Sequence, residues 1–159
     1  FAAAKLAISV AKEAGVKVSL TLSDPAMVEH FRHAFDELAE AGVDLVFCNE
    51  EEARLWTAAS SRDDAMTRLK TVCATAVMTC GKDGALVYDG DQTTLVAGFP
   101  TKAVDTTGAG DMFAGAFLYG ITHGMSFTEA ASLANKAASA LVSNFGARMP
   151  ADEVRALLG

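Results

Sequence analysis

Two short and almost fully apolar segments constrain the fold of this chain most strongly. They read DLVFC (44–48) and ATAVMTC (74–80), and segments with helical periodicity flank both. Strands that are apolar on both faces are typical of parallel sheets with helices on either side. A third segment, VKVSLTL (16–22), alternates and is rich in β-branched residues, as strands are. The pattern predicts an α/β fold built from right-handed βαβ units.

Helices are expected between and after these strands. Apolar residues recur at helical spacing in 3–14 and form one stripe in 26–41. Further helices are expected at 49–57, 62–72, 109–123, 127–144 and 151–158, and further strands at 85–89 and 93–98. The short glycine-containing turns around the later strands predict an antiparallel edge on a mostly parallel sheet. No repeat or low-complexity linker divides the chain, which predicts one α/β domain.

Charge and cysteine content exclude several classes of protein. The 159 residues carry 13 basic and 20 acidic side chains, a net charge of −7. A sequence-independent nucleic-acid binder needs a cationic surface, so nucleic acid is not an expected partner. No apolar stretch reaches the roughly 18 residues of a membrane span, so a membrane is not expected either. The three cysteines lack CxxC spacing, which favours reduced thiols and a cytoplasmic location.

The segment VDTTGAGDMFAGAFLYG (104–120) carries the clearest chemical signal. Gly108, Ala109 and Gly110 stand directly before a helical stretch, where small residues let backbone amides approach a ligand. The amides at a helix N-terminus favour an anion such as a phosphoryl group. Asp111 falls in the first turn, and a carboxylate beside an anion site needs a separate role, such as accepting a proton from a hydroxyl. Together these features suit phosphoryl transfer.

A simpler interpretation of the same segment remains open. Gly-Ala-Gly-Asp is also an ordinary loop and helix start, with Asp111 only favouring the helix dipole. The segment is not a Walker A loop, because GxxxxGK[ST] is absent, nor a Rossmann fingerprint, because residues 108–113 read GAGDMF.

Three segments in order resemble the PfkB carbohydrate kinase family, also called ribokinase-like. The DTTGAGD stretch and its following small-residue helix resemble the second signature of that family. Asn49 to Glu52 resembles its NxxE motif, and Thr79 to Gly84 resembles its TxGxxG nucleotide loop. The resemblance runs from about the SDP turn (23–25) to the C-terminal helix. It fits the sugar-kinase and adenosine-kinase-like branches equally.

The resemblance implies a fold and an activity for the whole segment. It implies a three-layer α/β/α ribokinase-like domain with a mostly parallel sheet and an antiparallel edge. Residues 1–159 would be the C-terminal nucleotide-binding and catalytic part, without the N-terminal half and its lid. The implied activity is transfer of phosphate from ATP to a hydroxyl of a sugar or nucleoside, with Mg²⁺ and, as a weaker expectation, K⁺. A homodimer is a further implied partner.

The resemblance also implies roles residue by residue. Asp111 would be the general base, and the amides of Gly108, Ala109 and Gly110 would form the anion hole. Nucleotide and Mg²⁺ contacts, the latter through water, would come from Asn49 and Glu52, and other nucleotide contacts from Thr79, Gly81, Gly84 and Asn135. A monovalent cation would be held by Asp105, Thr107 and the backbone near Gly146.

Each secondary motif has a structural explanation beside the functional one. Asn49 and Glu52 also fit an N-cap followed by a glutamate at the third helical position. Residues 79–84 also fit an ordinary glycine turn between strands. A second function, a nucleotide- or phosphate-binding module without catalysis, therefore stays open, and a hydroxymethylpyrimidine-type kinase is a lesser alternative. This segment alone is expected to be inactive, because a lid is needed to exclude water from the reaction.

Overall fold

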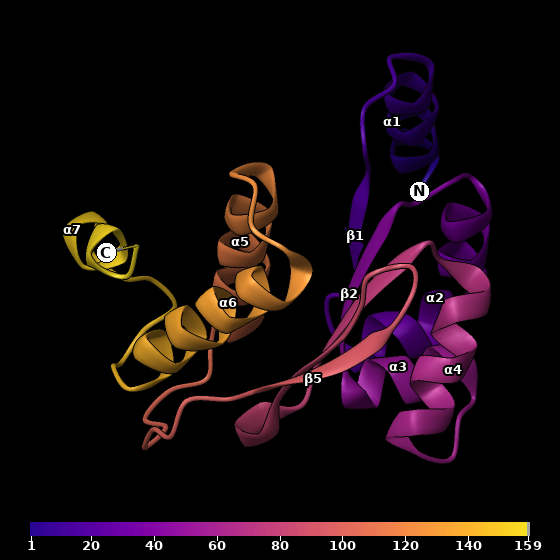
Figure 1. Ribbon diagram of the computed structural model, residues 1–159. Helices are drawn as coiled ribbons and strands as arrows, with labels where there is room; N and C mark the ends of the chain where they lie inside the picture. Colours follow the sequence, from indigo (N-terminus) through magenta and orange to yellow (C-terminus); the bar gives the residue numbers. More distant parts are fainter. Residues whose placement is uncertain (159) are drawn as a thin grey trace. The chain divides into compact units, whose positions relative to one another are not determined.

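The computed structural model describes residues 1–158 as two compact units. Unit 1 comprises residues 1–78 and 88–93, and unit 2 comprises 79–87 and the described residues from 94 onward. Within residues 1–158 the five strands follow one another in the sheet in chain order, β1-β2-β3-β4-β5. Seven α-helices accompany them in the same residues (Figure 1). The predicted α/β fold is confirmed.

Unit 1 is a parallel βαβ arrangement. Its elements are α1 (Ala2–Glu13), β1 (Ser19–Thr21), α2 (Pro25–Glu40), β2 (Leu45–Asn49), α3 (Glu50–Thr57), α4 (Arg62–Val72) and β3 (Thr75–Thr79) up to Met78. Strand β1 pairs in parallel with β2, with Ser19 opposite Leu45 and Thr21 opposite Phe47. Residues 45–48 of β2 are buried, as the apolar run predicted.

The strand expected at 16–22 is shorter in the structure. Only Ser19–Thr21 form β1. The preceding residues are held by Asp44 instead: its carboxylate accepts from the Val18 amide at 2.9 Å and from Lys17 Nζ at 2.8 Å. The pKa of Asp44 is lowered despite an opposing effect of burial, because Lys17, Val18 and Lys12 stabilise the charged form.

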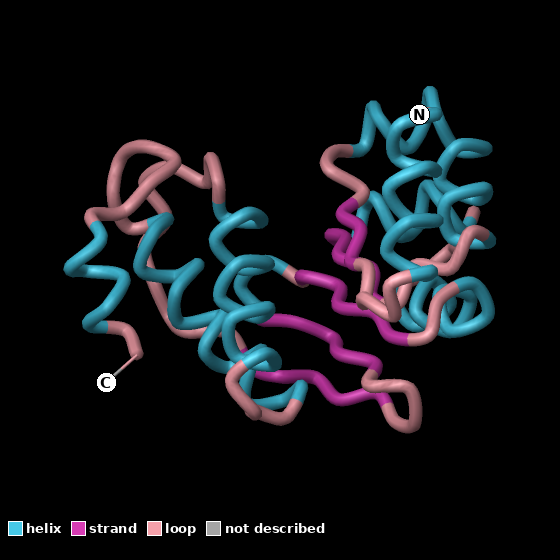
Figure 2. Tube along the Cα trace, turned by 90° about the horizontal axis from the view of Figure 1, so that it is seen from above, coloured by secondary structure: helices cyan, strands magenta, loops and turns pink. Residues whose placement is uncertain are grey.

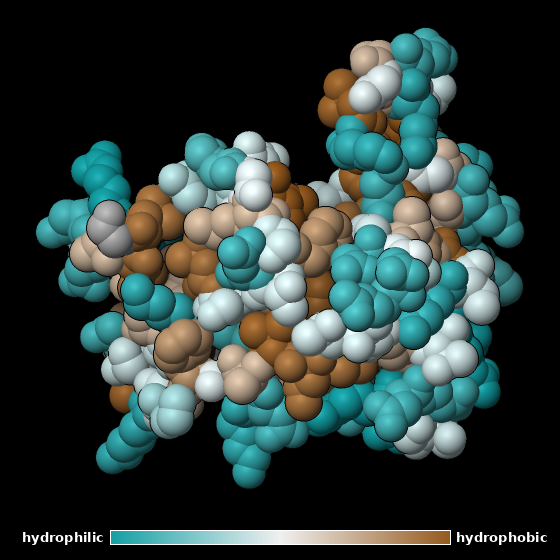
Figure 3. Space-filling model, viewed as in Figure 1, coloured by the Kyte–Doolittle hydropathy of each residue, from teal (hydrophilic) through white to brown (hydrophobic). Residues whose placement is uncertain are grey.

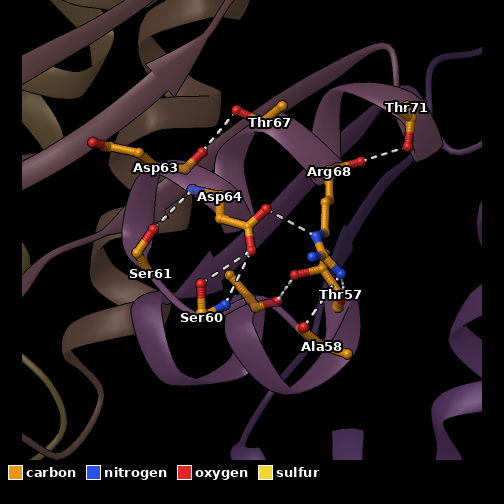
Figure 4. Close-up of polar contacts among 10 residues, drawn as sticks. Thr57, Ala58, Ser60, Ser61, Asp63, Asp64, Thr67, Arg68 and Thr71 are labelled. Atoms are coloured by element: carbon orange, nitrogen blue, oxygen red, sulfur yellow. Dashed lines mark hydrogen bonds and ion pairs between the residues drawn. The ribbon is translucent and has the colours of Figure 1, made fainter.

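The corner between α3 and α4 is closed by side-chain hydrogen bonds (Figure 4). Ser61 caps α4 by accepting from the Asp64 amide at 3.2 Å. The Asp64 carboxylate accepts from the Ser60 amide and from Arg68 Nε, each at 3.0 Å. Arg68 Nη1 then donates to the carbonyl of Thr57 at 2.9 Å, which satisfies an orphan acceptor at the end of α3. The corner therefore ties the end of α3 to α4, and the start of α3 carries two predicted site residues, Asn49 as its N-cap and Glu52 in its first turn.

Unit 2 combines a β-hairpin with helices. Its elements are a 3₁₀ turn η1 (Gly81–Asp83), β4 (Gly84–Tyr88) up to Val87, β5 (Thr93–Ala97) from Thr94, α5 (Ala109–Thr122), α6 (Phe127–Val142) and α7 (Ala151–Ala156), drawn by type in Figure 2. Four residues connect the neighbouring strands β4 and β5, a connection that only an antiparallel pair allows. The predicted antiparallel part of the sheet is therefore present.

Helices α5 and α6 pack closely through a glycine and an aromatic cluster. A Cβ added to Gly120 would lie 2.8 Å from the Cβ of Ala130, so the glycine lets the helices approach. Phe117 is fully buried and meets Phe127 edge-on, with ring centroids 5.3 Å apart. Among residues 1–158, none of the helices has both the length and the apolar character that crossing a bilayer would require.

Candidate active site

The N-terminus of α5 carries unused backbone donors. Gly108 precedes the helix in the left-handed region, with φ of 79°, and no side chain caps the helix there. The Ala109 amide donates to the Thr106 carbonyl at 3.2 Å, and the first intrahelical bond runs from Met112 to Gly108 at 2.9 Å. Within residues 1–158 the amides of Gly110 and Asp111 have no backbone acceptor. Ala109 is therefore occupied, whereas Gly110 remains available to an anion.

The two glycines at this terminus, Gly108 and Gly110, have different surroundings. A Cβ on Gly108 would lie 2.7 Å from the carbonyl oxygen of Ala147, so the absence of a side chain lets two chain segments pass closely. A Cβ on Gly110 would meet no atom of the described residues 1–158 within 4 Å. The space above Gly110 is therefore open, and an oxygen-bearing ligand can approach its amide there.

The Asp111 side chain is exposed beside these donors. Within residues 1–158 its carboxylate has no hydrogen-bond or ion-pair partner. Asp111 stands in the first turn of α5, beside the backbone donors of that helix N-terminus. An ionised carboxylate without a partner can accept a proton from a bound hydroxyl.

A pocket of about 540 Å³ opens beside Asp111 in unit 2. One wall is a stripe of α5, and others come from α6, from residues 147–149 and from α7. Among its described lining residues only Asp111 and Arg148 are charged, and the rest are small or apolar. The sequence analysis did not single out Arg148, although it is the one basic residue in the segment between α6 and α7.

Asp105 joins the segment before α5 to the segment after α6. Its carboxylate accepts from the Thr107 amide at 2.9 Å and from the Gly146 amide at 3.1 Å. Hydrogen bonds from Thr107, followed by that from Gly146, hold the pKa of Asp105 below its ordinary value. The structure thus brings together the three residues that the resemblance connected with a monovalent cation, and gives Asp105 a structural role at the same time.

The TxGxxG segment forms a tight turn in unit 2. The Cys80 amide donates to the Gly84 carbonyl at 2.8 Å, and the Asp83 amide donates to the Cys80 carbonyl at 3.1 Å. Gly84 has φ of 102°, and a Cβ there would overlap the Val96 carbonyl oxygen. Gly81 has φ of 56°, and a Cβ there would meet nothing within 4 Å. Gly84 is therefore required by the hairpin, whereas Gly81 leaves open space that a ligand could use.

Asn135 lies inside unit 2 and its amide is already engaged. The side chain of Asn135 is 7% exposed. Its Nδ2 donates to the carbonyls of Val96 at 3.0 Å and Ala97 at 3.1 Å. The residue thus secures α6 to β5, and a contact with a nucleotide would have to use its remaining carbonyl oxygen.

Asn49 and Glu52 form a capping box at the start of α3 in unit 1. The Glu52 amide donates to Asn49 Oδ1 at 2.8 Å, and the Asn49 amide donates to Glu52 Oε2 at 2.8 Å. Asn49 Nδ2 also donates to Glu52 Oε1 at 2.7 Å. Burial raises the pKa of Glu52, and the nearby charges of Asp24 and Glu51 raise it further. The hydrogen bond from the Asn49 amide opposes this rise but does not cancel it. The motif therefore forms the helix cap that its sequence also allowed.

The residues at the two helix starts suit different ligands among those that the resemblance implies, a phosphoryl group and Mg²⁺. The free amide and open space at Gly110 suit a phosphoryl oxygen. Glu52 keeps unused lone pairs on both oxygens, and Mg²⁺ retains several waters and needs few carboxylates, so an indirect contact suits this pair. Within residues 1–158 no cluster of three or more His, Cys, Asp or Glu side chains could hold a metal directly.

Comparison with known proteins identifies the family. Residues 2–154 match the pfkB family of carbohydrate kinases, and the chain belongs to this family. It is 32% identical to ribokinase of Haemophilus influenzae over 151 residues, which cover 91% of this chain and 47% of that protein. The chain therefore spans less than half the length of such a relative.

Solved structures of kinases share the fold. Adenosine kinase from Sinorhizobium meliloti matches with a TM-score of 0.91 and 35% identity over 97% of this chain and 48% of that one. Fructokinase from Vibrio cholerae O395, in its fructose-, ADP- and calcium-bound form, matches with a TM-score of 0.79 and 26% identity over 97% of this chain and 54% of that one. The suspected resemblance to PfkB kinases is confirmed.

Proposed function

We propose that residues 1–159 are the nucleotide-binding and catalytic part of an ATP-dependent kinase that phosphorylates a hydroxyl of a sugar or nucleoside. One observation carries the proposal: the unpartnered Asp111 carboxylate lies directly beside the free Gly110 amide at a single helix terminus. Membership of a family of carbohydrate kinases supports it. Acceptors of both kinds are represented among its relatives, which include a ribokinase and an adenosine kinase.

In the proposed reaction Asp111 takes the proton from the acceptor hydroxyl. The hydroxyl oxygen bonds to the terminal phosphorus of ATP while the bond from that phosphorus to the ADP oxygen breaks. The Gly110 amide and the positive end of α5 stabilise the charge on the phosphoryl oxygens. Mg²⁺, reached through water from Asn49 and Glu52, would neutralise phosphate charge when bound. Thr79, Gly81, Gly84 and Asn135 remain the proposed nucleotide contacts.

Replacing Asp111 by Asn tests the proposal. In the natural polypeptide that contains these residues, we expect kcat to fall by about 10²–10⁴-fold, the usual contribution of a general base. The Kd for Mg-ATP should change little, because Asn keeps the size of the side chain. Asp152→Asn is the matched control, since Asp152 is also an exposed first-turn aspartate, in α7. Full turnover in Asp111→Asn would overturn the assignment.

A nucleotide-binding module without catalysis is the second candidate. The observation in its favour is that the chain spans only about half the length of the relatives that it matches, 47% in the case of the Haemophilus influenzae ribokinase. This candidate predicts that isolated residues 1–159 bind Mg-ATP. It also predicts that the natural polypeptide shows no kinase activity that is lost in Asp111→Asn. Turnover of a panel of sugars and nucleosides, measured in the natural polypeptide, separates the candidates and identifies the acceptor.

The remaining expectations stand as parts of this proposal. A cytoplasmic location is supported by Cys48, Cys73 and Cys80, which are buried and, within residues 1–158, form no disulfide. A K⁺ ion beside Asp105 and Thr107 would stabilise the same loop that the Asp105 hydrogen bonds hold, and activity with and without K⁺ tests it. A homodimer is tested by sedimentation of the natural polypeptide.

A further inference from the structure

The pocket beside Asp111 in unit 2 holds two opposite charges that are not paired with each other. Asp111 and Arg148 are the charged side chains among its described lining residues. Within residues 1–158 neither side chain has a hydrogen-bond or ion-pair partner. Both are exposed, so both are available to a ligand that enters the pocket. The proposed function uses Asp111 and leaves the guanidinium of Arg148 without a role.

The chain around Arg148 is held against the start of α5. Two residues before it, the Gly146 amide donates to the Asp105 carboxylate at 3.1 Å. One residue before it, the carbonyl oxygen of Ala147 lies so close to α5 that a Cβ on Gly108 would approach it to 2.7 Å. These two contacts fix the backbone from which the Arg148 side chain extends into the pocket. The guanidinium is therefore placed beside the same helix start that carries the proposed general base.

The remaining walls of the pocket offer a ligand few polar side chains. Figure 3 shows hydrophobic residues gathered between α7 and the pair of helices α5 and α6. Lys136 Nζ on α6 donates to the carbonyl of Leu157 at 3.1 Å, which attaches the α7 wall to α6. Besides the two charged residues, the hydroxyl of Tyr119 is the one strong hydrogen-bonding side-chain group among the described lining residues. The other members of that wall set are small or apolar: Met112, Gly115, Ala116, Leu133, Ala137, Ala147, Met149, Val154, Leu157 and Leu158.

This lining favours a ligand that carries an anionic group. A neutral sugar has a hydroxyl on almost every carbon, and each hydroxyl that leaves water without a partner costs free energy. A guanidinium instead presents a rigid fork of donors that matches the two oxygens of a carboxylate or a phosphate. A ligand with one reacting hydroxyl and one anionic group would engage Asp111 and Arg148 at the same time.

We propose that Arg148 determines acceptor specificity by pairing with a carboxylate or phosphate group of the acceptor while the acceptor hydroxyl faces Asp111. The acceptor is then a sugar acid, a sugar phosphate or a nucleoside derivative with such a group, and not a neutral sugar. Arg148 transfers no proton and only orients the bound acceptor. The inference rests on the proposed function, because it takes the hydroxyl that meets Asp111 as the one that is phosphorylated.

Steady-state kinetics of the natural polypeptide with Mg-ATP test the inference. Acceptors are compared in matched pairs: glucose with gluconate, fructose with fructose 6-phosphate, ribose with ribose 5-phosphate, and adenosine with adenosine monophosphate. We expect kcat/KM to be at least about tenfold higher for the anionic member of one or more pairs. Arg148→Gln should lower kcat/KM for that acceptor by about 10–100-fold, mainly through KM, because a charged hydrogen bond is lost. The neutral member should be unaffected.

Binding and two further variants give independent readouts. Calorimetry without ATP, with the same anionic acceptors, should show about 10–100-fold weaker binding to Arg148→Gln and unchanged binding to Asp111→Asn. Arg148→Lys should recover part of the affinity, because it keeps the charge but loses the fork. Arg155→Gln is the control, since Arg155 is an exposed arginine of α7 that does not line the pocket. It should change neither binding nor kcat/KM.

Three outcomes would overturn the inference. One is an equal loss of kcat/KM for neutral and anionic acceptors in Arg148→Gln, since the guanidinium would then act on ATP or on the transferred phosphoryl group. Another is a preference for the neutral member in every pair, and a third is the absence of binding by all of the anionic acceptors. The kinase proposal fails on a different result: Arg148-dependent binding together with turnover that Asp111→Asn leaves intact would remove the general base and keep the anion site.

Discussion

The Asp105 carboxylate accepts a hydrogen bond from the Gly146 amide at 3.1 Å, across 41 positions of sequence. Its other oxygen accepts from Thr107 at 2.9 Å. The first bond ties the chain that enters α5 to the chain that leaves α6, and the Gly108 contact with Ala147 adjoins it. The terminus of α5, where Asp111 and the free Gly110 amide lie, is therefore positioned by a carboxylate that is not itself part of the proposed chemistry.

Asp105→Asn should lower the Tm of the protein at pH 7. Hydrogen bonds depress the pKa of Asp105 in the folded state, so its stabilisation is complete above the unfolded pKa of about 3.9 and is lost as pH falls through the folded value. The Tm difference between wild type and variant should stay constant from pH 7 to about pH 5 and shrink in more acidic solution. Thermal scans by circular dichroism measure it. Asp91→Asn, at an exposed turn position, is the control, and a pH-independent difference would contradict the prediction.

Gly84→Ala should be far more destabilising than Gly81→Ala. Both glycines have positive φ, but only at Gly84 would a Cβ overlap the Val96 carbonyl. We expect a loss of about 1 kcal/mol in the free energy of unfolding for Gly81→Ala, from backbone conformation alone. Gly84→Ala should lose about 3 kcal/mol or more, because steric overlap is added. Urea unfolding measures both, and equal losses would argue against the turn geometry.

Gly110→Ala should separate stability from activity. A glycine in a helix costs roughly 0.5–1 kcal/mol relative to alanine, and no atom lies within 4 Å of the added Cβ, so the variant should be more stable. The same methyl group occupies the approach to the free amide. We expect kcat of the natural polypeptide to fall about tenfold, equivalent to roughly 1.4 kcal/mol. A rise in Tm with unchanged kcat would remove Gly110 from the anion site.

Glu52→Gln should flatten the dependence of stability on pH. Burial raises the pKa of Glu52 in the folded state, so its contribution to stability is complete below the unfolded pKa of about 4.3 and is lost as pH rises through the folded value. The glutamine cannot ionise, so this decline should disappear in the variant. Chemical unfolding from pH 4 to pH 8 measures the slope. Glu29→Gln, on the exposed side of α2, should leave the slope of the wild type unchanged.

Local sequence signals predicted the elements well. The helix expected at 62–72 is α4 within the same bounds, and the helix expected at 26–41 is α2 (Pro25–Glu40), which Asp24 caps. These features depend on side chains that act within one turn of the backbone. The NxxE motif shows the limit of such signals, because a capping box and a magnesium contact need the same residues at the same spacing.

Contacts between distant segments were not readable from the sequence. Helix α5 contains two glycines, Gly115 and Gly120, beyond its first turn. A Cβ added to Gly115 would meet no atom of residues 1–158 within 4 Å, whereas Gly120 makes the close approach to Ala130. The Asn135 amide secures β5, a contact that the sequence did not indicate, and the expected contact of this residue with a nucleotide stays a prediction. Several small or polar residues on one helix look alike in the sequence. The packing of helices and strands decides which of them contacts a neighbouring element.

The sequence by itself determined the order of helices and strands and the unused donors at the start of α5, because periodicity, capping and glycine conformation act over a few residues. Only the tertiary structure decided which carboxylates are already occupied. Asp105 and Glu52 both accept two hydrogen bonds, whereas Asp111 accepts none within residues 1–158. The availability of a carboxylate for chemistry depends on what the rest of the chain brings within hydrogen-bond distance of it.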